Sequence, residues 1–255
     1  MLNNQSSSSS LQDQMLREFA AYQQKGRITD LPPLRLMLAL ALLLVCLACT
    51  LFFALHLKDH AQISLAITAA KKGDLVRMKE LVAGKASLVD AAGYSGRTPL
   101  WWAAAGGQVD VIKYCLEKKA DLNHQDTDGW TPLHAAAAHN QVAALQLLCQ
   151  YRADWTLRDK LGRTILHAAA TGTNPDTITA LIGMGFSPDL VDNAGWTPLH
   201  VAVFARQSKM VSLLLANHAS INLKTKDGLT PLGVANRMKH NDAIIDILMN
   251  NGGDM

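Results

Sequence analysis

The stretch Gly129-Trp130-Thr131-Pro132-Leu133-His134 decides the fold, because most of this pattern recurs every 33 residues. Each copy has a glycine, one variable residue, a threonine and then a leucine two positions later. The threonines are Thr98, Thr131, Thr164, Thr197 and Thr230, and the glycines are Gly96, Gly129, Gly162, Gly195 and Gly228. A fixed period of this length predicts a solenoid of stacked repeats.

Each copy contains the signals that begin a helix. The threonine side chain can cap the helix, and in four of the five copies a proline follows at the first helical position. The glycine allows a positive φ in the preceding turn, which neighbouring acidic residues such as Asp126 and Asp159 also favour. Alanines such as Ala136 and Ala137 keep this helix thin, and a second, more apolar helix follows it. Each copy therefore predicts a turn and two helices.

The repeated Thr-Pro-Leu-His tetrapeptide resembles the ankyrin-repeat family, whose unit is a β-turn followed by two antiparallel helices. Residues 64–84 resemble a degenerate first repeat. The resemblance implies an all-α fold, an ankyrin-repeat solenoid of six helix-turn-helix repeats, and the sequence before these repeats predicts a single transmembrane helix. The expected repeats are 64–94, 95–127, 128–160, 161–193, 194–226 and 227–255.

The uncharged run from Leu36 to Leu57 predicts the transmembrane helix, for which we expect the bounds 34–57. As a helix these 22 residues would extend about 33 Å, and a bilayer core is about 30 Å thick. A cleaved signal peptide fits less well, because its apolar region would be about 7–15 residues long. Cys46 to Cys49 weakly resembles a lipoprotein cleavage site, which leaves lipidation of Cys49 as an alternative.

The segments beside the span are polar. The polar composition of residues 1–33 predicts a mostly disordered tail, and an amphipathic helix at 11–22 is an alternative. Residues 58–63 predict a short linker to the ankyrin-repeat domain at 64–255. Basic residues next to the span lie mainly before it, which favours an extracytoplasmic array on a single-pass membrane protein. A wider window adds Lys71, Lys72 and Arg77 on the other side, so a cytoplasmic array stays open.

Composition and motifs do not favour catalysis. The 24 basic and 21 acidic residues are mixed along the chain, which does not favour a nucleic-acid partner. The four cysteines do not have the spacing of a zinc site. His134, His167 and His200 recur at the repeat period, and the family resemblance implies that they hydrogen-bond within and between turns. We expect no catalytic residue, metal, cofactor or small-molecule substrate.

The residue before each threonine is the main candidate for partner contact. In ankyrin-like proteins it projects from the turn tip, and tryptophan and arginine are enriched in binding hot spots. Alternatively, these side chains pack on the neighbouring turn. The ends of the first helices add further candidates. The predicted protein-binding residues are Tyr94, Arg97, Trp130, His139, Arg163, Trp196, Phe204 and Arg237.

These features predict a membrane-anchored protein-binding scaffold or localisation module that acts through the concave ankyrin surface. Two alternatives remain open. One is an immunity protein or inhibitor that neutralises a toxin or enzyme at the membrane. The other is a regulatory subunit of a membrane complex, which polar residues within the span would support. Only Thr50 and His56 are of that kind.

Overall fold

A computed structural model of the 255-residue chain describes Arg17, residues 33–238 and residues 241–254. The expected tail and the alternative helix at 11–22 lie outside the described residues, except for Arg17. The chain divides into two compact units between Lys58 and Asp59. The described residues contain helices and turns but no β-strand.

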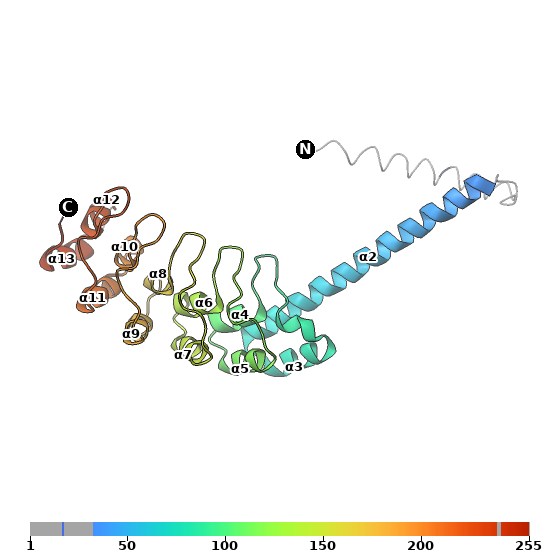
Figure 1. Cartoon of the computed structure of the whole chain (residues 1–255), viewed down its shortest axis with the longest axis horizontal. Helices are drawn as coiled ribbons and strands as arrows, with labels where there is room; N and C mark the ends of the chain where they lie inside the picture. The colour runs from blue at the N-terminus through green and yellow to red at the C-terminus, as the bar shows by residue number, and fades with distance from the viewer. Residues whose placement is uncertain (1–16, 18–32, 239–240, 255) are drawn as a thin grey trace. The chain divides into compact units, whose positions relative to one another are not determined.

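The second unit is a row of paired helices, which confirms the predicted solenoid (Figure 1). First helices pack against first helices and second helices against second helices along the row. The first helices are the end of α2 (Pro33–Lys72), α4 (Pro99–Ala105), α6 (Pro132–Ala138), α8 (Ile165–Ala170), α10 (Pro198–Phe204) and α12 (Pro231–Arg237). The second helices are α3 (Leu75–Gly84) with the short helix η2 (Ala86–Val89) after it, α5 (Val109–Glu117), α7 (Val142–Gln150), α9 (Pro175–Gly183), α11 (Ser208–Ala216) and α13 (Asp242–Asn250).

The threonines begin the first helices as predicted. Four of them accept a hydrogen bond from the backbone N–H three residues later. These are Thr98 at 3.2 Å, Thr131 at 3.3 Å, Thr197 at 3.4 Å and Thr230 at 3.1 Å. Thr164 occupies the same cap position, and its hydroxyl lies 2.8 Å from Nδ1 of His167. Each helix start is therefore fixed by contacts within four residues of sequence.

The turns between repeats are joined by backbone hydrogen bonds that need glycine at one position. Gly129 has a φ of 85°, and a Cβ there would lie 2.8 Å from the backbone nitrogen of Lys160 in the next turn. A side chain would block this close approach. Each turn donates one N–H to the turn before it: Thr127 to Ser95 at 3.0 Å, and Lys160 to Asp128, Asn193 to Leu161 and Lys226 to Ala194 at 2.9 Å.

One hydrophobic core runs through the array. Small buried residues of the first helices, such as Ala103, Ala136 and Ala169, let neighbouring repeats approach closely. Second helices contribute larger buried groups, such as Ile112 and Leu145. No repeat encloses this core alone, so stability depends on the interfaces between repeats.

Helix α2 is long and apolar enough to cross a membrane, judged by length and composition over Ala41–Lys72. Its described apolar side chains up to Leu57 are exposed. The last turns of the same helix belong to the first repeat, where Ala66 and Ala70 are buried. Residues 58–63, which we expected to form a linker, are helical. They contain neither glycine nor proline, so nothing in them ends the helix.

Candidate protein-binding surface

An ion pair links the turn before α4 to the turn before α6. Nε of Arg97 donates to Oδ2 of Asp126 at 2.9 Å, and Asp126 is buried. The other oxygen of Asp126 accepts the backbone N–H groups of Asp128 and Trp130 at 2.9 and 2.8 Å. The guanidinium of Arg97 also lies 4.2 Å from the centroid of the Trp101 ring. These contacts hold Arg97 in one place.

A second set of contacts links the third and fourth repeats through Asp159. Oδ2 of this buried carboxylate accepts hydrogen bonds from Nε of Arg163 at 2.7 Å and from Nε1 of Trp130 at 3.1 Å. The Arg163 guanidinium lies 5.8 Å from the Trp130 ring centroid. Trp130 and Arg163 are half-buried, so both side chains pack on a neighbouring turn while part of each stays accessible.

These turn tips border a groove of about 530 Å³. Its lining includes four residues that the sequence analysis proposed and five that it missed. The proposed residues are Arg97, Trp130, His139 and Arg163, and the missed residues are Trp101, Trp102, Asp128, Lys160 and Leu161. The sequence does contain a signal for two of them, because Trp101-Trp102 stands where the next three repeats have a histidine followed by alanine or valine.

The floor of this groove is aromatic. The rings of Trp101 and Trp102 are 5.0 Å apart at an interplanar angle of 70°, an edge-to-face contact. Trp101 is buried, whereas Trp102 is half-buried. The ring of His139 lies 6.2 Å from that of Trp101, and its Nδ1 is 2.9 Å from the carbonyl oxygen of Ala135.

The other four proposed residues do not line this groove. Trp196 and Phe204 form a separate aromatic pair, with ring centroids 5.5 Å apart at 79°, and Phe204 is 59% exposed. Tyr94 is 94% exposed and stacks on His60 at 5.3 Å. Arg237 is exposed at the end of α12. We name the first site the Trp130 groove and the pair in the fifth repeat the Trp196 cluster.

Each repeated histidine bonds within its own turn, and two of the three also fasten one turn to the next, as the family resemblance implied. Nδ1 of each lies 2.8 Å from its threonine hydroxyl. Nε2 of His167 and His200 meets the carbonyl oxygens of Trp196 and Leu229 at 2.9 and 3.1 Å. Burial lowers the pKa of all three imidazoles, for His134 to about 4. The neutral ring is therefore the form that these turns hold.

The described cysteines and carboxylates were the other candidates for metal binding or nucleophilic chemistry. Among the described residues, no three His, Cys, Asp or Glu side chains lie together as metal ligands would. Burial raises the pKa of the Cys115 thiol to about 12, so this cysteine stays protonated.

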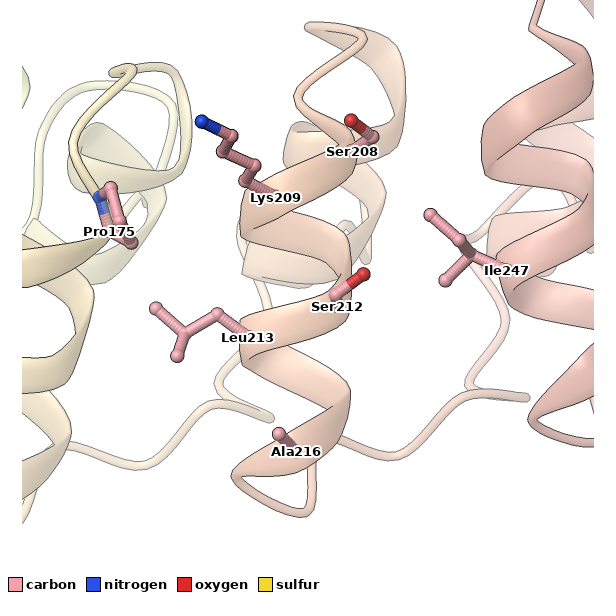
Figure 2. A pocket seen from close by; sticks show the side chains of 7 residues that line it. All are labelled: Pro175, Ser208, Lys209, Ser212, Leu213, Ala216 and Ile247. Carbon is pink, nitrogen blue, oxygen red and sulfur yellow. The ribbon is translucent and has the colours of Figure 1, made fainter.

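A second hollow of about 480 Å³ runs along α11 on the second-helix side of the array (Figure 2). Pro175 borders it on one side of α11 and Ile247 on the other, and Lys209 is its one charged side chain. This hollow lacks the aromatic floor and the ion pairs of the Trp130 groove.

The comparison with protein families agrees with this architecture. The family described as ankyrin repeats (3 copies) matches residues 65–159, 146–225 and 166–255. These matches cover well over half of the sequence, and the chain belongs to the ankyrin-repeat family.

Two curated proteins are similar to part of the chain. Ankyrin repeat and SAM domain-containing protein 6 of Danio rerio is 40% identical over 58 residues, which are 23% of this chain and 8% of that protein. Serine/threonine-protein kinase VIK of Arabidopsis thaliana is 38% identical over 72 residues, which are 27% of this chain and 16% of that protein. The chain thus spans less than a fifth of either relative.

Proposed function

We propose that this chain is a membrane-anchored module that binds a partner protein through the turn-tip side of its ankyrin array. Ankyrin repeats are interaction modules, and the family is typically non-enzymatic. The observation that carries the proposal is the Trp130 groove, where half-buried tryptophans and arginines lie together. Tryptophan and arginine in a partly desolvated pocket are typical of binding hot spots.

The Trp196 cluster extends the proposed surface. Phe204 is 59% exposed beside the half-buried Trp196, and an exposed aromatic side chain of this size favours contact with another molecule. Trp130 and Trp196 are two repeats apart, so with neighbouring helices packed 8–10 Å apart we expect roughly 20 Å between them. That span suits a protein interface of about 800 Å² per partner and exceeds most small ligands.

The test is a pull-down from solubilised membranes with Trp130→Ala, Trp196→Ala and Phe204→Ala, each checked by circular dichroism melting. Truncation of a central anchor typically costs at least about 2 kcal/mol, roughly 30-fold in affinity. Loss of capture with a retained fold supports the proposal. A partner that still binds when all three are replaced would exclude this surface as the binding site.

The proposed anchor is the span at Leu36 to Leu57, and its support is the length and apolar character of α2. We place the array on the extracytoplasmic side, because Lys25, Arg27 and Arg35 precede the span and only Lys58 follows it directly. An anchor at the membrane would also raise the effective concentration of a partner held there.

Two measurements test the anchor. The full-length chain should stay in the membrane fraction during carbonate extraction, and release into the supernatant would contradict the anchor. In intact cells, added protease should digest the array. Protection of the array until the membrane is permeabilised would place it in the cytoplasm instead.

A further inference from the structure

The charges at the two ends of the Trp130 groove are paired differently. At one end Arg97 bonds Asp126 through Nε, and its Nη2 lies 4.0 Å from Oδ2 of Asp128. At the other end Arg163 uses Nε for Asp159. Within the described part of the chain, neither the terminal nitrogens of Arg163 nor the Lys160 ammonium has a hydrogen bond or ion pair. The second end therefore carries an unpaired lysine beside an arginine that is paired through Nε and has two free terminal nitrogens.

The buried carboxylates of Asp126 and Asp159 below the groove are already engaged, so neither pairs with Lys160 or with the terminal nitrogens of Arg163. Oδ2 of Asp159 already accepts two hydrogen bonds, and its Oδ1 accepts the backbone N–H groups of Leu161 and Arg163 at 2.9 Å each. Asp126 is likewise engaged on both oxygens. The exposed Asp128 lies beside Arg97 at the paired end. A carboxylate from another molecule could therefore bind Lys160 and the terminal nitrogens of Arg163.

The floor of the groove between these two ends is apolar, and two cations of the array lie near the ring of Trp102. Arg97 lies 5.7 Å from the centroid of the Trp102 ring, and the Lys71 ammonium lies 4.8 Å from it. A cationic ligand would compete with these two groups and meet like charge from Lys160 and Arg163. Leu161 is 56% exposed next to the half-buried tryptophans, which leaves apolar surface for an apolar side chain.

We propose that the Trp130 groove binds a segment of the partner protein in which an aspartate or glutamate stands next to a large apolar or aromatic side chain. The carboxylate accepts hydrogen bonds from Lys160 and from the terminal nitrogens of Arg163, and the apolar side chain packs on Trp102, Trp130 and Leu161. At about 530 Å³ the groove has room for a few side chains. This inference rests on the proposed function and adds the chemistry of the ligand.

The array itself contains a matched control for the cationic end. Lys226 stands 66 residues after Lys160, and its backbone nitrogen donates to Ala194 at 2.9 Å, just as that of Lys160 donates to Asp128 at 2.9 Å. Both lysine side chains are exposed. The position that matches Arg163 is Leu229, so Lys226 has the same place in its turn without the second cation.

The experiment selects peptides from a displayed random library on the full-length chain in detergent micelles. Bound peptides should be enriched in aspartate or glutamate within three positions of tryptophan, phenylalanine or leucine. For the most enriched peptide, Lys160→Glu should weaken binding at least about tenfold, because it replaces an attraction by a repulsion. Lys226→Glu should change the affinity less than twofold. Circular dichroism melts of both variants should match the wild type, because both side chains are exposed.

The possible outcomes distinguish the ligand chemistry from the proposed function. Peptides that need Trp130 but show no acidic enrichment, or that bind Lys160→Glu as well as wild type, would overturn the ligand chemistry and leave the proposed function in place. A selection that yields no peptide sensitive to Trp130→Ala, Trp196→Ala or Phe204→Ala would overturn both.

Discussion

The Trp130 groove and the Trp196 cluster are built on the same backbone and differ in their side chains. In both, an aspartate holds its own turn through two backbone N–H groups, from Asp128 and Trp130 in one case and from Ala194 and Trp196 in the other. Around the groove, Arg97 and Arg163 clamp the turns by bonding buried carboxylates. In the last turn Thr225 takes the place that Asp126 has in its own turn, and its hydroxyl oxygen accepts a hydrogen bond from the backbone N–H of Leu229 at 3.2 Å.

This difference shows how a repeat scaffold separates folding from recognition. The cap, the glycine and the bonds between turns hold the framework in the second to sixth repeats, so the residue before the threonine is free to vary. In the second to fourth repeats this position carries charge and aromatic surface. In the fifth and sixth it carries Trp196 and Leu229, which pack against the core. The predictions below compare the two regions.

The largest expected effect compares two turn glycines. Gly129→Ala should destabilise the array by roughly 3 kcal/mol, because its φ is 85° and the new Cβ would lie 2.8 Å from the backbone nitrogen of Lys160. Gly228→Ala should cost only about 1 kcal/mol, because its φ is 75° but a Cβ meets nothing within 4 Å. Urea unfolding of both variants measures this. Equal losses would show that close stacking of the turns does not constrain Gly129.

Acid should loosen the turns held by buried histidines. Burial lowers the pKa of His134 from 6.5 to about 4, so between these values the unfolded chain binds more protons than the folded one. The free energy of unfolding should therefore fall as the pH drops from 6.5 towards 4, with a contribution from His134 on the order of 3 kcal/mol, and this contribution should level off below 4.

Urea unfolding at pH 7.5 and 4.5 tests the acid effect. His134→Gln should lose less stability over this range than the wild type does. His218→Asn changes an exposed histidine at a φ of 63°, which asparagine tolerates, and should behave as the wild type. If His134→Gln shows the full wild-type loss, the acid sensitivity has another origin.

The two arginine clamps should differ in strength. Arg97→Ala removes the one side-chain donor to Oδ2 of the buried Asp126, so we expect a loss of about 2–3 kcal/mol. Arg163→Ala leaves Trp130 Nε1 bonded to Oδ2 of Asp159, and about 1 kcal/mol should be lost. Thermal melts compare the variants directly. A larger loss for Arg163→Ala would contradict this account of the two carboxylates.

The smallest expected effects distinguish the aromatic residues. Trp130→Ala should cost about 1–2 kcal/mol of stability, because the half-buried indole bonds Asp159 and contacts Arg163. Phe204→Ala should stay within about 0.5 kcal/mol, because 59% of the residue is exposed. Thermal melts of the two variants show which aromatic side chain can be removed in a binding assay without a loss of stability. A collapse of the Phe204 variant would make that residue part of the packing.

The sequence by itself determined the repeat, the helix starts and the family. The signals for these features act over short distances: a threonine hydroxyl caps an N–H three residues later, and a glycine adopts a positive φ within its own turn. The helical conformation of residues 58–63 was missed, because an absence of helix-ending residues is a weaker signal than a cap.

Only the tertiary structure decided which side chains meet. The Trp130 groove joins Trp102, Lys160 and Arg163, which come from three repeats and lie up to 61 positions apart in the sequence. The tertiary structure also leaves two other predicted residues outside the groove: Tyr94 stacks on His60, and Phe204 packs on Trp196. The reason is physical: the contacts of a turn tip depend on the stacking of its neighbours, and side chains distant in sequence meet only after the repeats have packed.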